Sequence, residues 1–294
     1  MDNKKPILSI KELNVNFPVF GGILNRKVSA VHAVKDLSLD IQRGKTIGIV
    51  GESGSGKSTL GKAILNVLPI TAPDVEVTGQ IFLDNESERV DLLSLDKNEI
   101  KKYRPNIQMI FQDPYSSLNP RMIVHDIIKE PMDISTSLSG TEKDEKVSWL
   151  MNKVGLNSEQ ATRYPHEFSG GQRQRIGIAR SLATDPSIII ADEPVSALDV
   201  SIQAQVINLL MDLQEEFNLT ILFIAHDLSV VQHISTDIAV MYLGEAVEYD
   251  TTENIFSNPQ HEYTKTLLAS IPIASPKGRE ERKVKRKELK QFSQ

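Results

Sequence analysis

The chain has 294 residues, a formal net charge of −6 and no cysteine. This length suffices for one large domain or two small ones with a real core. The acidic balance argues against a nucleic-acid binder, and the lack of cysteine excludes disulfides, Cys-based zinc sites and Cys-ligated iron–sulfur clusters. No apolar run approaches the roughly 20 residues of a membrane-spanning helix, and the N-terminus lacks the apolar stretch of a signal peptide. We therefore expect any membrane role to come through partners.

The N-terminal part of the chain predicts strands and one glycine-rich loop. The alternating segment 7–17 is expected to form an edge strand, and the Pro- and Gly-containing stretch 17–34 a loop or hairpin insertion. The run "TIGIV" (46–50) is apolar and β-branched, which indicates a buried strand. It ends at a glycine-rich stretch, and the segment 57–67 then predicts a helix.

Further along, short apolar runs alternate with helical segments. Residues 113–167 have helical periodicity and Pro-rich joints, so we expect a helical subdomain inserted into an α/β core. Repeated β–α units predict a mostly parallel sheet that is covered on both faces. The strand candidates are "QIFLD" (80–84), "NIQMIF" (106–111), "SIIIAD" (187–192), "TILFIAH" (220–226) and "IAVMYLG" (238–244).

The segment "GESGSGKST" (51–59) matches the pattern G-x-x-x-x-G-K-[ST]. Glycines let backbone N–H groups curl around phosphate oxygens, and the following helix presents its positive N-terminal end. Lys57 is expected to reach the β and γ phosphates, and Ser58 to ligate Mg²⁺. The alternative is a glycine-rich turn before a helix. The predicted nucleotide-binding residues are Gly51, Ser53, Gly54, Ser55, Gly56, Lys57, Ser58 and Thr59.

Two acidic residues follow the Ile-rich strand at 187–192. Asp192 is predicted to hold Mg²⁺ beside the phosphates, and Glu193 to act as the general base for the attacking water. The alternative is a pair of acids that cap the next helix. A second small-residue turn, "SGGQ" (169–172), opens another helix and so predicts a second anion-binding helix terminus. Two such cradles suggest a site that is closed by a second copy or a partner.

Taken in order, these motifs resemble the ATPase subunits of ABC transporters, from about Ile7 to Pro272. The resemblance implies a P-loop NTPase (RecA-like) core with an antiparallel β subdomain, in an ABC ATPase domain over residues 1–250. It also implies a head-to-tail dimer in which ATP on one Walker A loop meets the signature loop of the other subunit. The motifs it assigns are Walker A at 51–59, the Q-loop Gln112, the signature Ser169, Gly170, Gly171 and Gln172, Walker B with Asp192 and Glu193, the D-loop with Asp199, and the switch His226.

The same resemblance implies roles for several of these residues. Ser169 and Gly171 would contact the γ-phosphate in trans. Gln112 would sense Mg²⁺ and the attacking water, and His226 would hold the γ-phosphate and orient the general base. Phe17 corresponds to the aromatic residue that stacks on adenine, although the nearby Phe20 or simple core packing could also account for a ring there.

Several longer stretches are similar to one group within the family, the oligopeptide/dipeptide importers. These are "IQMIFQDPYSSLNPRM" (107–122), "EPVSALDVSIQAQVINLLMDLQ" (193–214) and "NPQHEYTKTLLASIP" (258–272), and the insertion at 17–34 resembles the F-type subunit. The resemblance implies a paralogous ATPase in a heterodimer, two membrane permeases and an external solute-binding protein. It places the chain peripherally at the cytoplasmic face of the cell membrane, with ATP and Mg²⁺ as ligands and no nucleic-acid partner.

The C-terminal extension, residues 251–294, departs from that group. Many members carry a cysteine-bearing iron–sulfur region there, which a chain without cysteine cannot build. Instead the segment 276–290 holds eight Lys or Arg and three Glu. We expect a solvated terminus, with contact to anionic lipid headgroups as the alternative.

Three other functions stay open at this stage. Closely related cassettes energise import of nickel, metal chelates or other small solutes. Soluble non-transport ABC ATPases usually carry two cassettes or a long coiled coil, and neither feature is present here. Exporter cassettes are often fused to a membrane domain, which is also absent.

Overall fold

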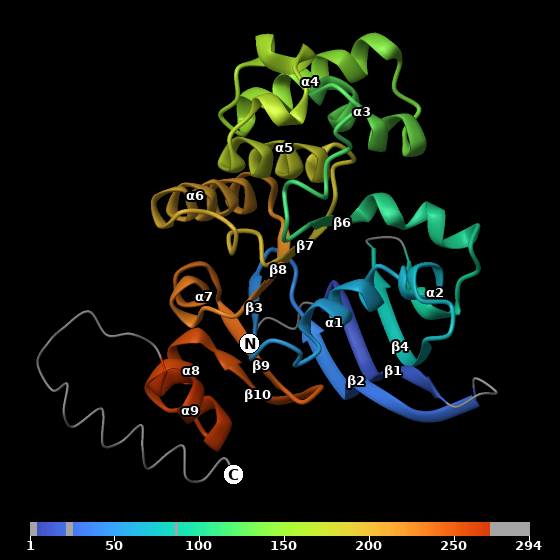
Figure 1. Ribbon diagram of the computed structural model, residues 1–294, viewed down its shortest axis with the longest axis vertical. Coiled ribbons are helices and arrows are strands. Elements are labelled where there is room, and N and C mark those ends of the chain that lie inside the picture. Colours follow the sequence, from blue (N-terminus) through green and yellow to red (C-terminus); the bar gives the residue numbers. More distant parts are fainter. Residues whose placement is uncertain (1–4, 22–25, 86–87, 271–294) are drawn as a thin grey trace, which may run out of the picture.

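The computed structural model describes residues 5–21, 26–85 and 88–270 (Figure 1). The N-terminal part forms a four-stranded antiparallel sheet with the order β2-β1-β4-β5. Its strands are β1 (Leu8–Gly21), β2 (Arg26–Ile41), β4 (Glu76–Asp84) and β5 (Arg89–Asp91). This sheet is the antiparallel β subdomain that the family resemblance implies.

The position of β1 corrects one prediction. The segment 7–17 was expected at a sheet edge, but β1 pairs with β2 on one side and with β4 on the other. Alternating hydrophobicity reports a buried face and says nothing about how many neighbours a strand has. The stretch 17–34 pairs as a hairpin, with Phe17 opposite Val31, and residues 22–25 lie outside the described residues.

The second sheet has six strands in the order β10-β9-β3-β8-β7-β6. The strands from β9 to β6 run parallel, and β10 is antiparallel to β9, which confirms the predicted mostly parallel core. Every residue of β3, β7 and β8 is buried, as expected for strands covered on both faces. The strands are β3 (Thr46–Val50), β6 (Ile107–Ile110), β7 (Ile188–Asp192), β8 (Thr220–Ala225), β9 (Asp237–Tyr242) and β10 (Glu245–Thr251).

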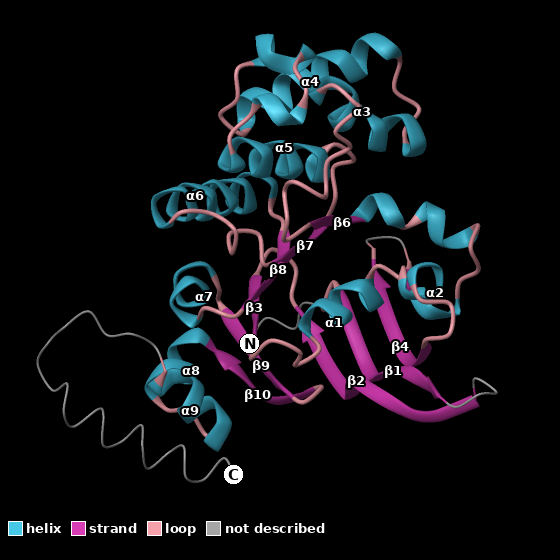
Figure 2. Ribbon diagram, in the orientation of Figure 1, coloured by secondary structure: helices cyan, strands magenta, loops and turns pink. Residues whose placement is uncertain are grey.

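Helices surround this sheet, and three of them form a separate group at the top of Figure 2. This group consists of α3 (Val124–Ser135), α4 (Gly140–Lys153) and α5 (Gly170–Leu182), which pack on one another. The remaining α-helices are α1 (Lys57–Ile64), α2 (Leu68–Thr71), α6 (Val200–Phe217), α7 (Leu228–Ile234), α8 (Thr252–Ser257) and α9 (Glu262–Ala269). Short 3₁₀ helices occur at Leu92–Ser94, Glu99–Lys102, Arg104–Asn106, Ser158–Thr162 and Pro165–Glu167.

The helix predicted over 57–67 is shorter than expected. It ends at Ile64, and Asn66 has a left-handed backbone with φ of 50°. Because a left-handed backbone cannot continue a right-handed helix, α2 begins as a separate turn after Asn66. Within the described residues, no helix is long and apolar enough to cross a membrane. The basic segment 276–290 lies outside the described residues.

The parallel sheet divides the core into two hydrophobic clusters, one on each face. Along β7, Ile188 and Ile190 join one cluster while Ile189 and Ala191 join the other. One cluster continues into α1 and the antiparallel sheet, and the other into helices α3 to α7. The sheet is therefore held from both sides, and the ends of its strands are fixed in position for a site.

Candidate active site

The glycine loop, residues 51–56, joins β3 to α1. Its backbone path requires glycine at several positions. Gly54 and Gly56 have φ of 84° and 100°, in the region that favours glycine. A Cβ on Gly51 would lie 2.1 Å from the carbonyl oxygen of Met241, and one on Gly56 would lie 2.0 Å from that of Ala33. The loop thus packs closely against β9 and β2, and a glycine-rich backbone of this kind can cradle an anion with its N–H groups.

The Lys57 ammonium group lies inside this loop. Its Nζ donates hydrogen bonds to the carbonyl oxygens of Gly51 (2.8 Å) and Glu52 (2.7 Å) and contacts Ser55 Oγ at 3.3 Å. Only 4% of the residue is exposed, and burial lowers the pKa of Lys57, although the charge of Glu193 opposes the shift. A phosphate group in the loop could replace these carbonyl acceptors with stronger, charged ones.

Ser58 and Asp192, 134 residues apart, meet beside the loop. Ser58 Oγ donates a hydrogen bond of 2.8 Å to Asp192 Oδ1. Burial is the main cause that raises the pKa of Asp192; the hydrogen bond from Ser58 opposes this, and the charge of Glu193 adds to it. A hydroxyl and a carboxylate are the oxygen ligands that Mg²⁺ prefers, so this pair fits the predicted metal site.

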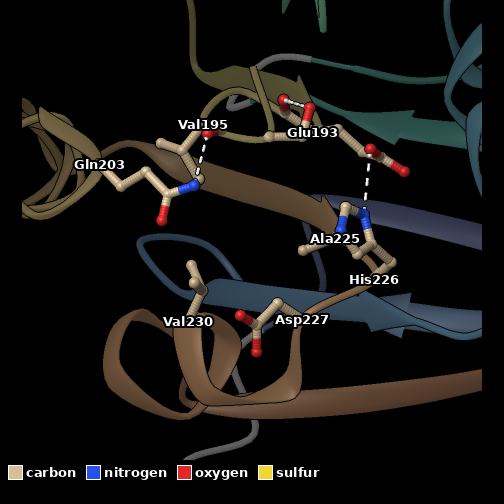
Figure 3. A pocket seen from close by; sticks show the side chains of 8 residues that line it. Glu193, Val195, Gln203, Ala225, His226, Asp227 and Val230 are labelled. Carbon is tan, nitrogen blue, oxygen red and sulfur yellow. Dashed lines mark hydrogen bonds and ion pairs between the residues drawn. The ribbon is translucent and has the colours of Figure 1, made fainter. Parts of the chain in front are cut away.

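Glu193 follows β7 and receives two side chains at one carboxylate oxygen. Gln112 Nε2 donates to Glu193 Oε2 at 2.9 Å, and His226 Nδ1 lies 3.1 Å from the same atom. Figure 3 shows the His226 ring extending toward the carboxylate. Glu193 has φ of 45°, and its N–H donates to the carbonyl oxygen of Ile224. The three predicted catalytic residues are therefore brought together.

A pocket of about 60 Å³ opens beside this carboxylate. Glu193 has 16% of its side chain exposed and His226 has 57% exposed, so solvent reaches the group that would serve as the base. The pocket is lined by Glu193, Val195, Ser196, Gln203, Ala225, His226, Asp227 and Val230 (Figure 3).

The segment Ser169–Gln172 forms the first turn of α5. Ser169 Oγ accepts from the Gln172 N–H at 3.3 Å, and Gln172 Oε1 accepts from the Ser169 N–H at 2.9 Å, which makes a capping box. A Cβ on Gly171 would lie 2.5 Å from Ile202 Cγ2 in α6. Figure 1 shows α5 in the upper group of helices and α1 in the lower part of the molecule. Within this chain, the two predicted anion-binding helix ends lie apart.

The remaining predicted site residues are Asp199, Phe17, Ser53 and Thr59. Asp199 is the exposed N-cap of α6 and makes no capping hydrogen bond. Phe17 is half-buried in β1 against the hydrophobic core, while Phe20 is 42% exposed. Ser53 is exposed in the loop, and Thr59 is half-buried in α1. Their roles stay predictions.

Two arginines of α5 support the site without having been predicted from the sequence. Arg180 Nη1 donates to the carbonyl oxygen of Ser117 at 2.6 Å, and its guanidinium lies 5.7 Å from the Phe111 ring centroid. The Arg173 guanidinium lies 3.8 Å from the ring centroid of Tyr115. Both arginines thus hold the segment that follows β6. A sequence signal existed, because residues seven apart share one face of a helix.

Comparison with known families gives two matches. The ABC transporter family matches residues 34–196, and the family described as the oligopeptide/dipeptide transporter C-terminal region matches residues 247–294. The first match covers the glycine loop, Gln112, the signature segment, Asp192 and Glu193, and the second begins within β10. His226 lies between the two matched ranges.

Individual proteins agree with these families. The oligopeptide transport ATP-binding protein AppF of Bacillus subtilis is 50% identical over 277 residues, which are 94% of this chain and 81% of AppF. The glutathione import ATP-binding protein GsiA of Escherichia coli O157:H7 is 50% identical over 272 residues, which are 92% of this chain but 42% of GsiA.

Two solved structures share the fold. One is cbiO1 of Clostridium perfringens, part of the ABC transporter complex cbiONQ, with a TM-score of 0.70, 26% identity and coverage of 87% of this chain and 92% of that chain. The other is the dimeric cassette MJ0796 bound to ADP and Pi, with a TM-score of 0.68, 29% identity and coverage of 83% and 98%. This chain therefore belongs to the ABC transporter family, among the ATP-binding subunits that serve as the ATPases of oligopeptide/dipeptide importers.

Proposed function

We propose that this chain binds and hydrolyses Mg·ATP to power the import of oligopeptides or dipeptides, as a peripheral subunit at the cytoplasmic face of the cell membrane. The observation that carries the proposal is the convergence of Gln112 and His226 on one oxygen of Glu193. This carboxylate directly follows Asp192, which is bonded to Ser58 of the glycine loop.

The residues of the chain divide the chemical work. Lys57 and the loop N–H groups bind and orient the phosphates, a role in which positioning and charge neutralisation supply most of the catalysis. Ser58 and Asp192 would hold Mg²⁺, with Gln112 beside them, and the bound ion would neutralise charge on the phosphate oxygens. Glu193 would take the proton of the attacking water, with Gln112 and His226 fixing its orientation.

The separation of α5 from the glycine loop supports a shared site. The segment Ser169–Gln172 is a capped helix N-terminus that, among the described residues, lies apart from the glycine loop of its own chain. In a head-to-tail dimer, this helix end would cover the ATP bound at the glycine loop of a paralogous ATPase. The signature segment of the partner would cover the ATP bound at Lys57. Asp199 would lie at the contact between the two ATPases. The ring of Phe17 would stack on the adenine of ATP.

The transported solute is proposed from the comparisons. The matched C-terminal region and AppF are both named for oligopeptides, and GsiA is named for glutathione, which is itself a peptide. Two membrane permeases would receive the motion of the helices around α3 to α5, and an external solute-binding protein would supply the peptide. Related cassettes for nickel, metal chelates or other small solutes are the second candidate.

A single co-purification tests this proposal. A tagged Glu193→Gln chain is expressed in its native host, and membranes are solubilised gently with Mg·ATP present. We expect two polytopic permeases and a second ATPase to purify with the tag, because nucleotide that is bound but not cleaved favours the closed dimer. Recovery of ribosomes or DNA-bound proteins without any membrane protein would contradict the transport function. A tagged chain that carries both Glu193→Gln and Lys57→Ala serves as the control. We expect the second ATPase not to purify with it in an ATP-dependent way.

A further inference from the structure

Helix α9 contacts the glycine loop directly. The backbone N–H of Glu52, the second residue of that loop, donates a hydrogen bond of 3.0 Å to the hydroxyl oxygen of Tyr263 in α9. These residues are 211 positions apart. The carbonyl oxygen of the same Glu52 accepts the 2.7 Å hydrogen bond from Lys57 Nζ. One peptide segment thus connects α9 to the lysine that would bind phosphate.

The Tyr263 ring is fixed by a second contact. It packs on the ring of Tyr242 at a centroid distance of 4.2 Å and an interplanar angle of 31°. Tyr242 is the last residue of β9 and directly follows Met241, whose carbonyl oxygen faces Gly51. Three elements therefore contact one another pairwise: the end of β9, the start of the glycine loop and α9.

The N-terminal end of α9 is itself anchored. The Glu248 carboxylate in β10 accepts the N–H groups of Gln260 (2.8 Å) and His261 (3.0 Å). His261 Nδ1 accepts the N–H of Tyr263 at 3.1 Å, which fixes the start of the helix. Because β10 pairs with β9, α9 is held to the sheet at the same place where its tyrosine reaches the loop.

We infer that Tyr263 is a positioning residue for nucleotide binding, and that α9 is a structural part of the nucleotide site. This inference rests on the proposed function, since it concerns the same glycine loop. The Tyr263 hydroxyl keeps the Glu52 peptide in one orientation before nucleotide arrives. Without it, the N–H turns to water and the loop samples more conformations, so that ordering the loop costs binding free energy.

The test compares two variants that each lose one hydroxyl. Tyr263→Phe keeps the ring contact but removes the acceptor for the Glu52 N–H, whereas Tyr242→Phe keeps both the ring contact and that hydrogen bond. Binding of a fluorescent ATP analogue is titrated with each variant and with the unmodified chain. We expect Tyr263→Phe to raise the Kd about fivefold, the equivalent of one ordinary hydrogen bond, and Tyr242→Phe to leave the Kd unchanged.

The two proposals fail in distinguishable ways. If the unmodified chain binds no nucleotide, the proposed function is wrong. If it binds nucleotide and Tyr263→Phe has the same Kd, or if Tyr242→Phe raises the Kd equally, the role of Tyr263 is wrong. Amide hydrogen exchange gives a readout that needs no ligand: we expect slow exchange at Glu52 in the nucleotide-free chain and faster exchange in Tyr263→Phe. Fast exchange in the unmodified chain would overturn the inference.

Discussion

Gln112 donates a hydrogen bond of 2.9 Å to Glu193, which connects the segment just after β6 with the residue that follows β7. The two strands are neighbours in the parallel sheet, so their carboxyl ends place these side chains together. A displacement of the segment that carries Gln112 would therefore change or break the hydrogen bond to the predicted general base, Glu193. That segment leads into α3 and α4, which gives the site a physical connection to the upper helices.

Lys57→Ala is expected to weaken nucleotide binding strongly. The ammonium group is buried in the loop, where the Gly51 and Glu52 carbonyl oxygens and the Ser55 hydroxyl are its acceptors, and its positive charge attracts phosphate. We expect at least a hundredfold higher Kd for ATP, in line with about 3 kcal/mol for a lost charged hydrogen bond. The measurement is a fluorescence titration, with the exposed Lys101→Ala as control. An unchanged Kd would refute the phosphate cradle.

Gly56→Ala and Gly54→Ala separate two demands on the loop. Both positions have positive φ, which costs about 1–2 kcal/mol for a residue with a Cβ. Only at Gly56 would the Cβ also meet a carbonyl oxygen, that of Ala33, at 2.0 Å, whereas at Gly54 nothing lies within 4 Å. Urea unfolding and ATP titration should show a much larger loss for Gly56→Ala. Equal losses would mean that the contact with β2 is unimportant.

The raised pKa of Asp192 predicts a pH-dependent cost. The unfolded carboxyl titrates near its ordinary value of 3.8, and the folded one at higher pH because burial disfavours its charge. Stability is therefore lost as the pH rises from 3.8 through the folded pKa, and the loss persists at neutral pH. Asp192→Asn removes this cost while keeping an acceptor for Ser58.

Urea unfolding of the nucleotide-free chain across a series of pH values checks this prediction. We expect Asp192→Asn to be more stable than the unmodified chain at about pH 8, with the advantage shrinking as the pH falls through the raised pKa. Asp126→Asn, at an exposed position, serves as the control. A lower stability of Asp192→Asn at about pH 8 would show that the carboxylate is stabilising in the absence of ligand.

Arg180→Met is expected to destabilise the chain by about 2 kcal/mol, because the Ser117 carbonyl oxygen would lose its charged donor in a half-buried position. Burial lowers the pKa of Arg180, yet its guanidinium group stays charged at neutral pH. Urea unfolding measures the change, with the exposed Arg121→Met as the comparison. If both variants unfold at the same urea concentration, Arg180 does not hold the segment after β6.

Much of the α/β core could be predicted because its signals are local. The runs "TIGIV", "SIIIAD" and "TILFIAH" are short and mainly apolar, and the structure places β3, β7 and β8 on them. The glycine loop carries its own conformational demand in Gly54 and Gly56. The grouping of Gln112 with His226 came from the order of motifs in a known family, since no local pattern brings together residues from two strand ends.

Other features depend on long-range contacts that leave no periodic trace. The prediction that β1 lies at a sheet edge was wrong because its second partner, β4, follows the glycine loop and α1 in the chain. Tyr263 was not predicted, because its partner Glu52 is 211 residues away and a lone tyrosine in a helix is most simply explained by packing. Arg180 lies among buried residues of α5, and its partner on the segment after β6 is a backbone carbonyl group, which any residue could supply.

The most direct test of the account is the release of phosphate by the Glu193→Gln chain with Mg·ATP, measured together with the nucleotide that remains bound. The substitution keeps the shape of the side chain but removes the basic carboxylate. We expect ATP to bind with unchanged affinity, while turnover falls by about 10²- to 10⁴-fold, as for loss of a general base. Turnover at the rate of the unmodified chain would contradict the assignment of Glu193, and with it the catalytic centre described here.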